Sequence, residues 1–406
     1  MSARTTDVDV LVVGAGPAGV AAAVALHRAG RMPVVIDKAV FPRDKCCGDG
    51  LTTLALRELE ALGLQPSAVE SFRRVDDVVV RAPGGRTVVL PLPRGRGVFA
   101  GVTRRAELDA ALVDVAAGAG IPVHQGCAVK DVTQDAGGVT VDAEGLGQLR
   151  AAHVVAADGM WSPVRRALDL GEDGYLGEWH AFRQYVSGVT GPAADRLFVW
   201  FDADLLPGYA WSFPLPDGRA NVGFGILRAS GRRIQDVKQT WATFLDRPHV
   251  TAALGPGTEP EGRHLAWPIP ARIDRAVLAH GRTLFVGDAA GATDVMTGEG
   301  IGQALLSGRL AGTAIATGGT AGSIAAGYTR SVRAELVADH RMSVLLGKVL
   351  ARRRGADGAI AIVDHSGAWG RRNFARWMFE DEPRAIAVTP QRWHRGFLRR
   401  PGAYTG

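Results

Sequence analysis

The chain has 406 residues, of which 47% are hydrophobic and 22% are charged. This balance is typical of a folded protein with a large core and excludes a disordered chain. The formal net charge is +6, and arginine supplies almost all of the surplus, because lysine occurs only five times. The basic residues form no nucleic-acid-binding motif, so nucleic acid is not expected as a partner.

The three cysteines are Cys46, Cys47 and Cys127, an odd number without paired spacing. This pattern favours a reducing compartment, and the lack of cysteine after Cys127 excludes an iron–sulfur segment. The first residues contain no apolar signal segment, and no run of eighteen apolar residues occurs. We therefore expect a cytoplasmic protein without a metal site.

The N-terminal part has the pattern of a strand–helix–strand unit. Val8–Val13 is an apolar strand-type run, an Ala-rich helix extends to about Ala29, and Pro33–Ile36 is the next strand. A helix is predicted over 103–118, and strands are predicted over 123–132, 138–143 and 154–157.

The pattern changes after residue 164. Short aromatic-rich runs between Gly and Pro turns predict an antiparallel sheet with strands over 182–189, 197–201, 210–213 and 221–226. A buried parallel-type strand follows over 283–286, and a helix is predicted over 298–315 with Thr297 as its N-cap. The last segment, 323–406, is rich in arginine and predicted to be mostly helical.

A glycine-rich turn joins the first strand to the first helix. Gly14 permits the tight turn, Gly16 lets a pyrophosphate approach the backbone, and Gly19 lets the helix pack on the strand. The helix N-terminus favours phosphate, and Asp37 at the end of the next strand can bind ribose hydroxyls. Ala18 and Lys38 adjoin these positions. This turn predicts a dinucleotide site and does not by itself separate NAD from FAD.

Three later elements separate the two cofactors. They are an R-x-x-L-D helix start, a D-G turn after a strand and a G-D turn followed by a G-E-G helix start, and they resemble those of the flavoprotein hydroxylase and reductase superfamily of the p-hydroxybenzoate hydroxylase type. The resemblance covers about residues 8–320 and implies FAD. The additional cofactor-binding positions that it implies are Arg105, Asp158, Gly287, Asp288, Gly298, Gly300 and Ile301.

The same superfamily has an FAD domain that is interrupted by a substrate-binding antiparallel sheet. We therefore predict an α/β plus α+β fold in which a Rossmann-type FAD-binding domain comprises 1–75, 103–165 and 275–322. The antiparallel-sheet substrate domain is expected over 76–102 and 166–274, and the C-terminal helical segment over 323–406.

Two motifs resemble the geranylgeranyl reductase family within that superfamily. Pro42–Leu51 resembles its P-x-x-K-x-C-G-x-G-L segment, and Pro207–Pro214 with Asn221–Gly225 resembles its Y-x-W-x-F-P…G…N-x-G-x-G sheet. The chain departs from the family where Asp294 and Val295 replace Asn-Pro, beside the expected active site.

The strand pattern predicts a substrate pocket. Tyr209, Trp211 and Phe213 alternate and therefore share one face of a strand, and Asn221, Gly223 and Gly225 do the same on the next strand. An aromatic wall beside a groove without side chains suits a long apolar chain, whereas the structural alternative is an aromatic sheet core with Gly at bulges.

The resemblance implies that reduced FAD transfers hydride to a C=C bond of an isoprenoid chain. Cys47 matches the family cysteine and is predicted to donate the proton or to position reactants, with Gly48 beside it at the flavin. Tyr209 and Trp211 are the other predicted catalytic residues. Cys46 and Cys127 are predicted to be inert.

The sequence is also compatible with two other functions. A flavin monooxygenase needs only a shielded flavin, whereas a halogenase needs a lysine that is missing between Lys45 and Lys130. The second alternative function, after the flavin monooxygenase or halogenase, is that of a protein that binds flavin but catalyses no reaction. The electron donor is expected to be NADPH without its own Rossmann domain, or a ferredoxin or separate flavin reductase.

The C-terminal segment mixes arginine with aromatic residues, such as Trp369, Trp377, Trp393 and Phe397. This composition suits either a helical cover on the FAD domain or peripheral contact with a membrane surface. We expect the cover and keep the membrane as the alternative, with a hydrophobic small molecule as substrate.

Overall fold

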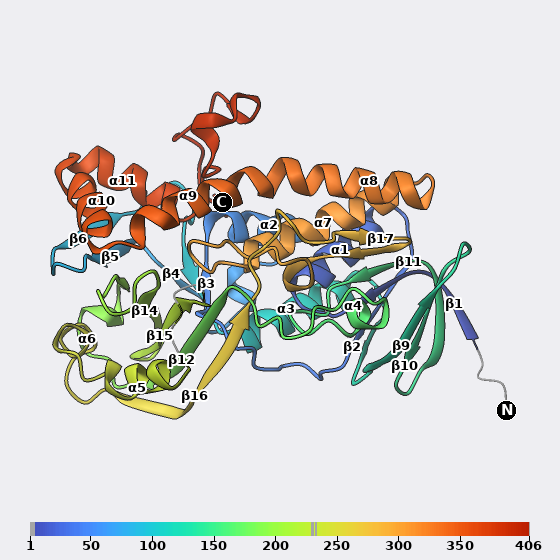
Figure 1. Cartoon of the computed structure of the whole chain (residues 1–406), viewed down its shortest axis with the longest axis horizontal. Helices are drawn as coiled ribbons and strands as arrows, with labels where there is room; N and C mark the ends of the chain where they lie inside the picture. The colour runs from blue at the N-terminus through green and yellow to red at the C-terminus, as the bar shows by residue number, and fades with distance from the viewer. Residues whose placement is uncertain (1–4, 229–230, 232–233, 406) are drawn as a thin grey trace.

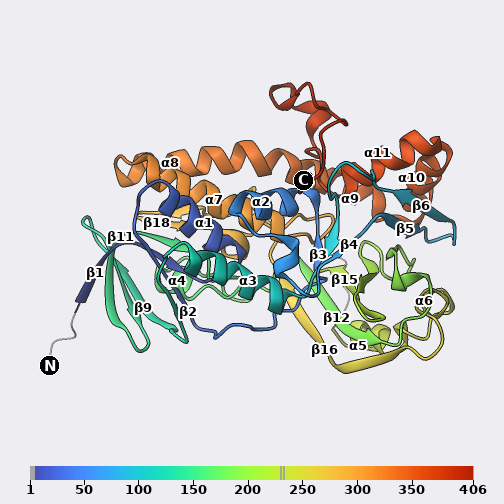
Figure 2. The same ribbon diagram turned by 180° about the vertical axis from the view of Figure 1, so that it is seen from behind.

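The computed structural model describes residues 5–228, 231 and 234–405. Two large sheets lie at opposite ends of the molecule, and the C-terminal helices run along one edge above both (Figure 1). The view from behind shows the same arrangement (Figure 2). This mixed α/β architecture with a C-terminal helical segment confirms the predicted fold class.

The first sheet has eight strands in the order β17-β18-β11-β1-β2-β8, with the β9–β10 hairpin attached to β11. The central pairs β1–β11, β1–β2 and β11–β18 are parallel, which places the turns after these strands at one edge. The bounds are β1 (Thr5–Val13), β2 (Pro33–Asp37), β8 (Val123–Gln125), β9 (Val129–Gln134), β10 (Val139–Ala143), β11 (Gly147–Ala156), β17 (Ala279–His280) and β18 (Thr283–Phe285).

Two helices with small residues pack closely beside this sheet. They are α1 (Pro17–Arg28) and α7 (Ile301–Thr317). A Cβ added at Gly308 would lie 2.0 Å from the Ala18 carbonyl oxygen, so this crossing requires glycine. The same core includes α2 (Thr53–Leu62), α3 (Arg105–Gly118) and α8 (Ala321–Val332).

The second sheet has seven strands in the order β16-β12-β15-β14-β13-β5-β6, antiparallel except for the β13–β5 pair. Its bounds are β5 (Asp77–Arg81), β6 (Thr87–Pro91), β12 (Trp179–Ser187), β13 (Leu197–Trp200), β14 (Tyr209–Leu215), β15 (Arg219–Leu227) and β16 (Glu259–Ile269). One face packs against α5 (Ile234–Phe244) and α6 (Pro248–Leu254), and the other against α10 (Arg353–His365) and α11 (Gly367–Met378).

A third, three-stranded sheet lies between the two large ones. It joins β3 (Gly50–Leu51) and β4 (Arg73–Arg74) to β7 (Gly101–Val102). The loop that carries the cysteines therefore enters a strand paired with residue 102, which anchors that loop at the junction of the two large sheets.

The structure corrects three element predictions. Helix α7 begins at Ile301 with Gly300 as its N-cap, so Thr297 is not the cap; residues 295–297 form a turn, and 298–300 have no regular secondary structure. The strand expected over 154–157 is the end of the ten-residue β11. The strand expected over 123–132 is divided into β8 and β9. The C-terminal segment is mostly helical, as predicted: α9 (Ala338–Leu350), α10 and α11 follow α8, α11 ends at Met378, and residues 379–405 form turns and short 3-10 pieces.

Candidate functional site

The glycine-rich turn has almost no room for side chains. Gly14 has a φ of 108°, and a Cβ there would lie 2.3 Å from the Ala157 carbonyl oxygen. A Cβ on Gly19 would lie 1.7 Å from the Gly14 carbonyl oxygen. The predicted reasons for glycine at these two positions therefore agree with the local geometry, and the start of α1 is presented as a bare backbone surface.

Asp37 braces this turn from the end of β2. Its buried carboxylate accepts hydrogen bonds from the backbone N–H of Ala15, at 2.7 Å, and of Ala39, at 2.8 Å. These bonds hold the turn against the strand and orient the carboxylate. Lys38, predicted beside it, is exposed at the surface.

Arg43 lies over the glycine turn and was not singled out from the sequence. One guanidinium nitrogen lies 3.5 Å from the place that a Cβ on Gly16 would take. Its Nη1 lies 3.0 Å from Asp109 Oδ2, yet it is buried without a hydrogen bond of good geometry. A buried cationic nitrogen beside a bare backbone is suited to phosphate. Its only sequence signal was its place within Pro42–Leu51.

Arg105 is held rigidly at the start of α3. Its guanidinium donates to both oxygens of Asp109, at 2.9 and 2.8 Å, and both side chains are buried. The R-x-x-L-D spacing thus forms an internal ion pair one turn long. The same guanidinium faces the Cys47 thiol and favours its thiolate form.

The two aspartates after β11 and β18 have different environments. Asp158 Oδ2 accepts from the Ser162 hydroxyl, at 2.8 Å, and from the Val164 N–H, at 3.0 Å, whereas Oδ1 is buried without a partner. Burial raises the pKa of Asp158 to about 6. Burial also opposes ionisation of Asp288, but Lys45 at 2.8 Å, together with Arg105 and Thr293, outweighs burial and holds the pKa of Asp288 below its ordinary value.

The two motifs of the geranylgeranyl reductase type meet in space. The loop around Gly48 lies on the aromatic face of β14, because a Cβ on Gly48 would lie 3.4 Å from Phe213 and 3.5 Å from Trp211. A Cβ on Gly50 would lie 2.8 Å from the Phe213 ring. Two segments more than 150 residues apart therefore form one wall, and glycine makes the approach of loop to ring sterically possible.

A hydrogen-bond network centres on Asp49, which was not singled out from the sequence. Its fully buried Oδ2 accepts from the Tyr185 hydroxyl, at 2.7 Å, and from the Asn221 amide, at 2.8 Å. Asn221 also donates to the Cys47 carbonyl and accepts from the Trp211 indole N–H. Asn221 thus locks the cysteine loop to the sheet. The sequence signal for Asp49 was weak, since it is one letter within C-G-D-G.

Three acidic groups surround this junction, and burial raises the pKa of each. The pKa of Asp49 rises to about 6 and that of Glu299 to about 8, with the neighbouring Glu380 adding to the effect on Glu299. Burial also raises the pKa of the Cys47 thiol. Near neutral pH, Cys47 and Glu299 therefore hold protons, whereas Asp49 is mostly ionised.

The groove expected over Gly223 and Gly225 is filled. A Cβ on Gly223 would lie 2.4 Å from the Trp211 ring, and one on Gly225 would lie 3.0 Å from the Trp179 ring. The missing side chains let two indoles lie flat on β15. The prediction of a bare groove was wrong, and the aromatic-core alternative describes these two positions.

The turn before α7 is tied to both the sheet and the C-terminal segment. The Tyr209 hydroxyl donates to the Thr297 carbonyl beside Gly298. Asp294 Oδ1 accepts from the Thr297 N–H, at 2.8 Å, and its Oδ2 lies 3.4 Å from buried Arg384. Asp294, the departure from the family pattern, is therefore compensated by an arginine of the C-terminal segment, and the pKa of Asp294 stays below its ordinary value although burial opposes this.

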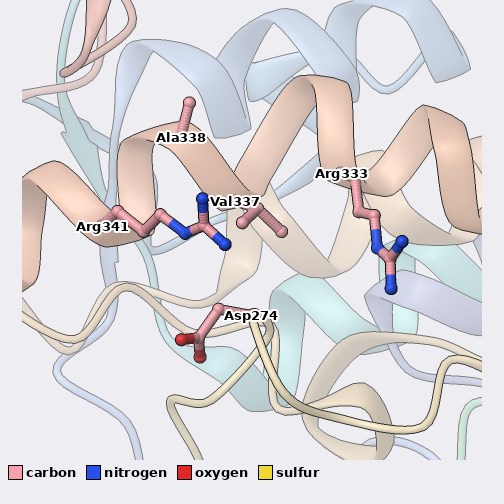
Figure 3. A pocket seen from close by; sticks show the side chains of 5 residues that line it. All are labelled: Asp274, Arg333, Val337, Ala338 and Arg341. Carbon is pink, nitrogen blue, oxygen red and sulfur yellow. The ribbon is translucent and has the colours of Figure 1, made fainter.

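Two pockets lie near these elements. One of about 240 Å³ opens beside Asp288 and is lined by Trp161, Arg165 and Arg272 among others. The other, of about 430 Å³, contains none of the motif residues and is shown in Figure 3. Its lining residues are Asp274, Arg333, Val337, Ala338 and Arg341.

The residues at the glycine turn fit the FAD that the motifs imply. The turn is a cradle that a Cβ at Gly14 or Gly19 would fill. Two buried polar atoms near it, Arg43 Nη1 and Asp158 Oδ1, make no hydrogen bond within the protein, although Nη1 lies 3.0 Å from Asp109. Bare backbone, a cationic nitrogen and a free carboxylate oxygen are the groups that pyrophosphate and sugar hydroxyls require.

Comparisons with known proteins agree with this chemistry. A family described as an FAD binding domain matches residues 7–323. The menaquinone reductase of Mycolicibacterium smegmatis is 35% identical over 332 residues, which is 77% of this chain and 78% of that protein. Digeranylgeranylglycerophospholipid reductase 2 of Methanopyrus kandleri is 31% identical, over 75% of this chain and 76% of that protein.

Solved structures share the fold. A geranylgeranyl bacteriochlorophyll reductase-like protein from Thermoplasma acidophilum superposes with a TM-score of 0.78 at 21% identity, over 96% of this chain and 100% of that chain. The flavin-dependent halogenase CmlS superposes with a TM-score of 0.70 at 21% identity, over 92% of this chain and 72% of that chain. The fold alone thus accommodates both reductases and halogenases.

Among the described residues, none of the helices is long and apolar enough to cross a membrane. The family match and the two relatives each cover three quarters or more of the chain, and the family match includes the motifs around Gly14, Cys47, Tyr209 and Asp288. The chain therefore belongs to the geranylgeranyl reductase family of FAD-dependent oxidoreductases.

Proposed function

We propose that the protein reduces C=C bonds in the isoprenoid chain of a hydrophobic small molecule. The observation that carries the proposal is the contact between the loop at Gly48 and the aromatic face at Trp211 and Phe213, which joins the two motifs of the reductase type. The relatives named after menaquinone and after digeranylgeranyl lipids support an isoprenoid substrate. NADPH, a ferredoxin or a separate flavin reductase would supply the electrons.

In this proposal, one group of residues holds the cofactor, and a second group supplies the proton for the reaction. Gly14, Gly16 and the start of α1 would hold the pyrophosphate of FAD, and Asp37 and Asp288 would hold its hydroxyl groups. When bound, FAD supplies the hydride for reduction of the double bond. The aromatic side chains of β14 line the side where an apolar chain would pack.

Saturation of a C=C bond needs one proton besides the hydride, and we assign that proton to the Cys47 thiol. Its pKa is raised, so the thiol is protonated at neutral pH, and Asn221 fixes its loop to the sheet. Glu299 is the rival donor, because a pKa of about 8 lies closer to neutral pH. Tyr209 and Trp211 hold the surrounding wall and the turn before α7.

The experiment that tests this function starts from the holoprotein reduced under anaerobic conditions. One sample is mixed with an oxygen-free solution of a digeranylgeranyl lipid, in which the isoprenoid double bonds are the only groups that can accept hydride, and a second is mixed with aerated buffer. We expect the prenylated acceptor to reoxidise the flavin rapidly, as followed by its absorbance. Fast reoxidation by oxygen together with no response to the prenylated acceptor would support the monooxygenase alternative, which the halogenase-like fold accommodates.

A further inference from the structure

Positive charge is concentrated in the C-terminal part of the chain. Residues 338–406 contain thirteen Lys and Arg residues against six Asp and Glu residues. Their net charge of +7 exceeds the +6 of the whole chain, so residues 1–337 are slightly acidic. One part of the sequence therefore accounts for the basic character of the protein, and an anionic partner would be attracted to it.

The acidic residues of this part are occupied by internal ion pairs. Asp339 pairs with Arg392 at 2.9 Å, Glu382 with His394 at 2.9 Å, and Asp381 with Arg376. In the described part of the chain, several exposed basic side chains have no carboxylate within ion-pair distance. They are Arg341, Lys348, Arg352, Arg354, Arg372, Arg395, Arg399 and Arg400.

Helix α9 presents an outward stripe that mixes these charges with apolar side chains. Arg341, Val344, Leu345, Lys348 and Val349 follow the three- and four-residue spacing of one helix face. Leu345 is 59% exposed and Val349 is 50% exposed, so the apolar part of the stripe has no partner within the protein. The opposite face is anchored, because His340 and Ser343 are buried.

The neighbouring elements also carry exposed apolar side chains. Of the fourteen large hydrophobic side chains that are exposed in the described residues, eight lie between 344 and 397. Beyond α9 they are Ile362, Trp369, Val388, Trp393 and Phe397. Both views place α9, α10, α11 and the turns beyond them along the same edge of the molecule (Figures 1 and 2). We call this edge, residues 341–399, the basic apolar edge.

The pocket in Figure 3 opens beside this edge. Arg341 contributes both to the pocket and to the stripe on α9, and Arg333 faces the pocket from the π-helical segment Arg333–Val337 that precedes α9. The carboxylate of Asp274 lies across from them and is 3.2 Å from His340. The pocket thus adds a second exposed arginine next to the stripe.

We propose that the basic apolar edge binds the surface of an anionic phospholipid bilayer. Exposed indole and aliphatic side chains are suited to the boundary between headgroups and acyl chains, and unpaired arginines are suited to headgroup phosphates. The mixture of both on one edge favours a lipid surface over a nucleic acid, which would require a basic face with fewer protruding aliphatic groups. This proposal is independent of the substrate.

The test is co-sedimentation of the full-length holoprotein with vesicles. We expect binding to vesicles of phosphatidylcholine mixed with phosphatidylglycerol, weak binding to phosphatidylcholine alone, and weakening by salt. The double variant Arg341→Gln, Lys348→Gln should partition about tenfold less strongly. Leu345→Ser, Val349→Ser should also weaken binding, and this loss should persist at high salt.

Matched changes elsewhere give the control. Lys130→Gln removes an exposed charge on β9, and Met32→Ser removes an apolar side chain that is 65% exposed. Both should bind vesicles as the unmodified protein does, and flavin content should be equal in all variants. No binding to anionic vesicles, or equal losses in the edge and control variants, would overturn the proposal. Retention of an acidic protein without vesicle binding would assign the edge to a protein partner instead.

Discussion

The nucleotide side of the site and its reaction side are built by different means. Around Gly14 and Gly19, the backbone itself forms the surface, and added atoms would lie within 2.3 Å of carbonyl oxygens. Around Asp49 and Glu299, side chains from distant segments bring buried charge together, with raised pKa values. The first region depends on the absence of side chains, whereas the second depends on their protonation.

This difference predicts how each region fails. A methyl group added in the glycine turn would clash with backbone atoms, which cannot move aside as a flexible side chain could. Loss of a carboxyl group at the reaction side removes a buried ionisable group. We therefore expect it to lower the rate of the reaction more than the free energy of unfolding. The predictions below test this distinction, beginning with the largest expected effect.

Gly19→Ala should abolish FAD binding and destabilise the protein by about 3 kcal/mol or more, because its Cβ would lie 1.7 Å from the Gly14 carbonyl oxygen. The unmodified protein should purify yellow and release free FAD on acid denaturation. Gly118→Ala is the control, since nothing lies within 4 Å of its added Cβ in α3. Normal flavin content in Gly19→Ala would contradict the account of the turn.

Cys47→Ala should slow reoxidation of the reduced flavin by a prenylated acceptor about 10²–10⁴-fold, the range of general acid catalysis, while FAD binding stays intact. Stopped-flow absorbance measures the rate. Cys46→Ala is the matched control, because burial raises the pKa of this neighbouring thiol to about 12 and it has no predicted role. A loss below about tenfold would make Cys47 a positioning residue and transfer the proton to Glu299.

Asp288→Ala should weaken FAD binding by about 1.5–3 kcal/mol, the value of a hydrogen bond to a charged group. The apo protein should keep its melting temperature, because the partner of Asp288 is the partly exposed Lys45. Fluorescence titration with FAD measures the affinity, and Asp135→Ala removes an exposed carboxylate on the β9–β10 turn as a control. Unchanged affinity would remove Asp288 from the cofactor site.

Glu299→Gln should have the smallest effect and should appear as a change in pH dependence. The pKa of Glu299 is raised in the folded protein from 4.5 to about 8. The stability that protonated Glu299 contributes to the folded protein is therefore fully present below pH 4.5 and is lost as the pH rises through about 8. The variant should lose less stability over this interval, because glutamine carries no proton that is released on unfolding or at high pH. Denaturant titrations at several pH values measure it, and the exposed Glu144→Gln should behave as the unmodified protein.

The nucleotide side could be predicted from the sequence because its determinants are local. Gly14, Gly16, Gly19 and Asp37 lie within one strand–helix–strand unit, and spacing alone places them together. The fold class and the family followed from the same kind of motif. The start of α7 was placed too early, because Thr297 reads as a cap although Gly300 takes that position.

The reaction side could be predicted only in part because its contacts are tertiary. The two motifs were identified from the sequence, but the contact of Gly48 with Trp211 and the indole that fills the space over Gly223 were not predicted, because both depend on packing between distant segments. Asp49 and Arg384 were missed for the same reason, since Tyr185, which bonds Asp49, and Asp294, which pairs with Arg384, lie more than eighty residues away in the chain. A single polar letter in a sequence does not reveal whether it will be buried.

The most direct test of the central claim is the mass of the product formed by the reduced holoprotein with a prenylated acceptor, compared without and with oxygen. Reduction of the isoprenoid chain gives a product with two additional hydrogen atoms per reduced double bond, formed equally well without oxygen. A product with one additional oxygen atom, formed only when oxygen is present, would contradict the reductase and establish a monooxygenase.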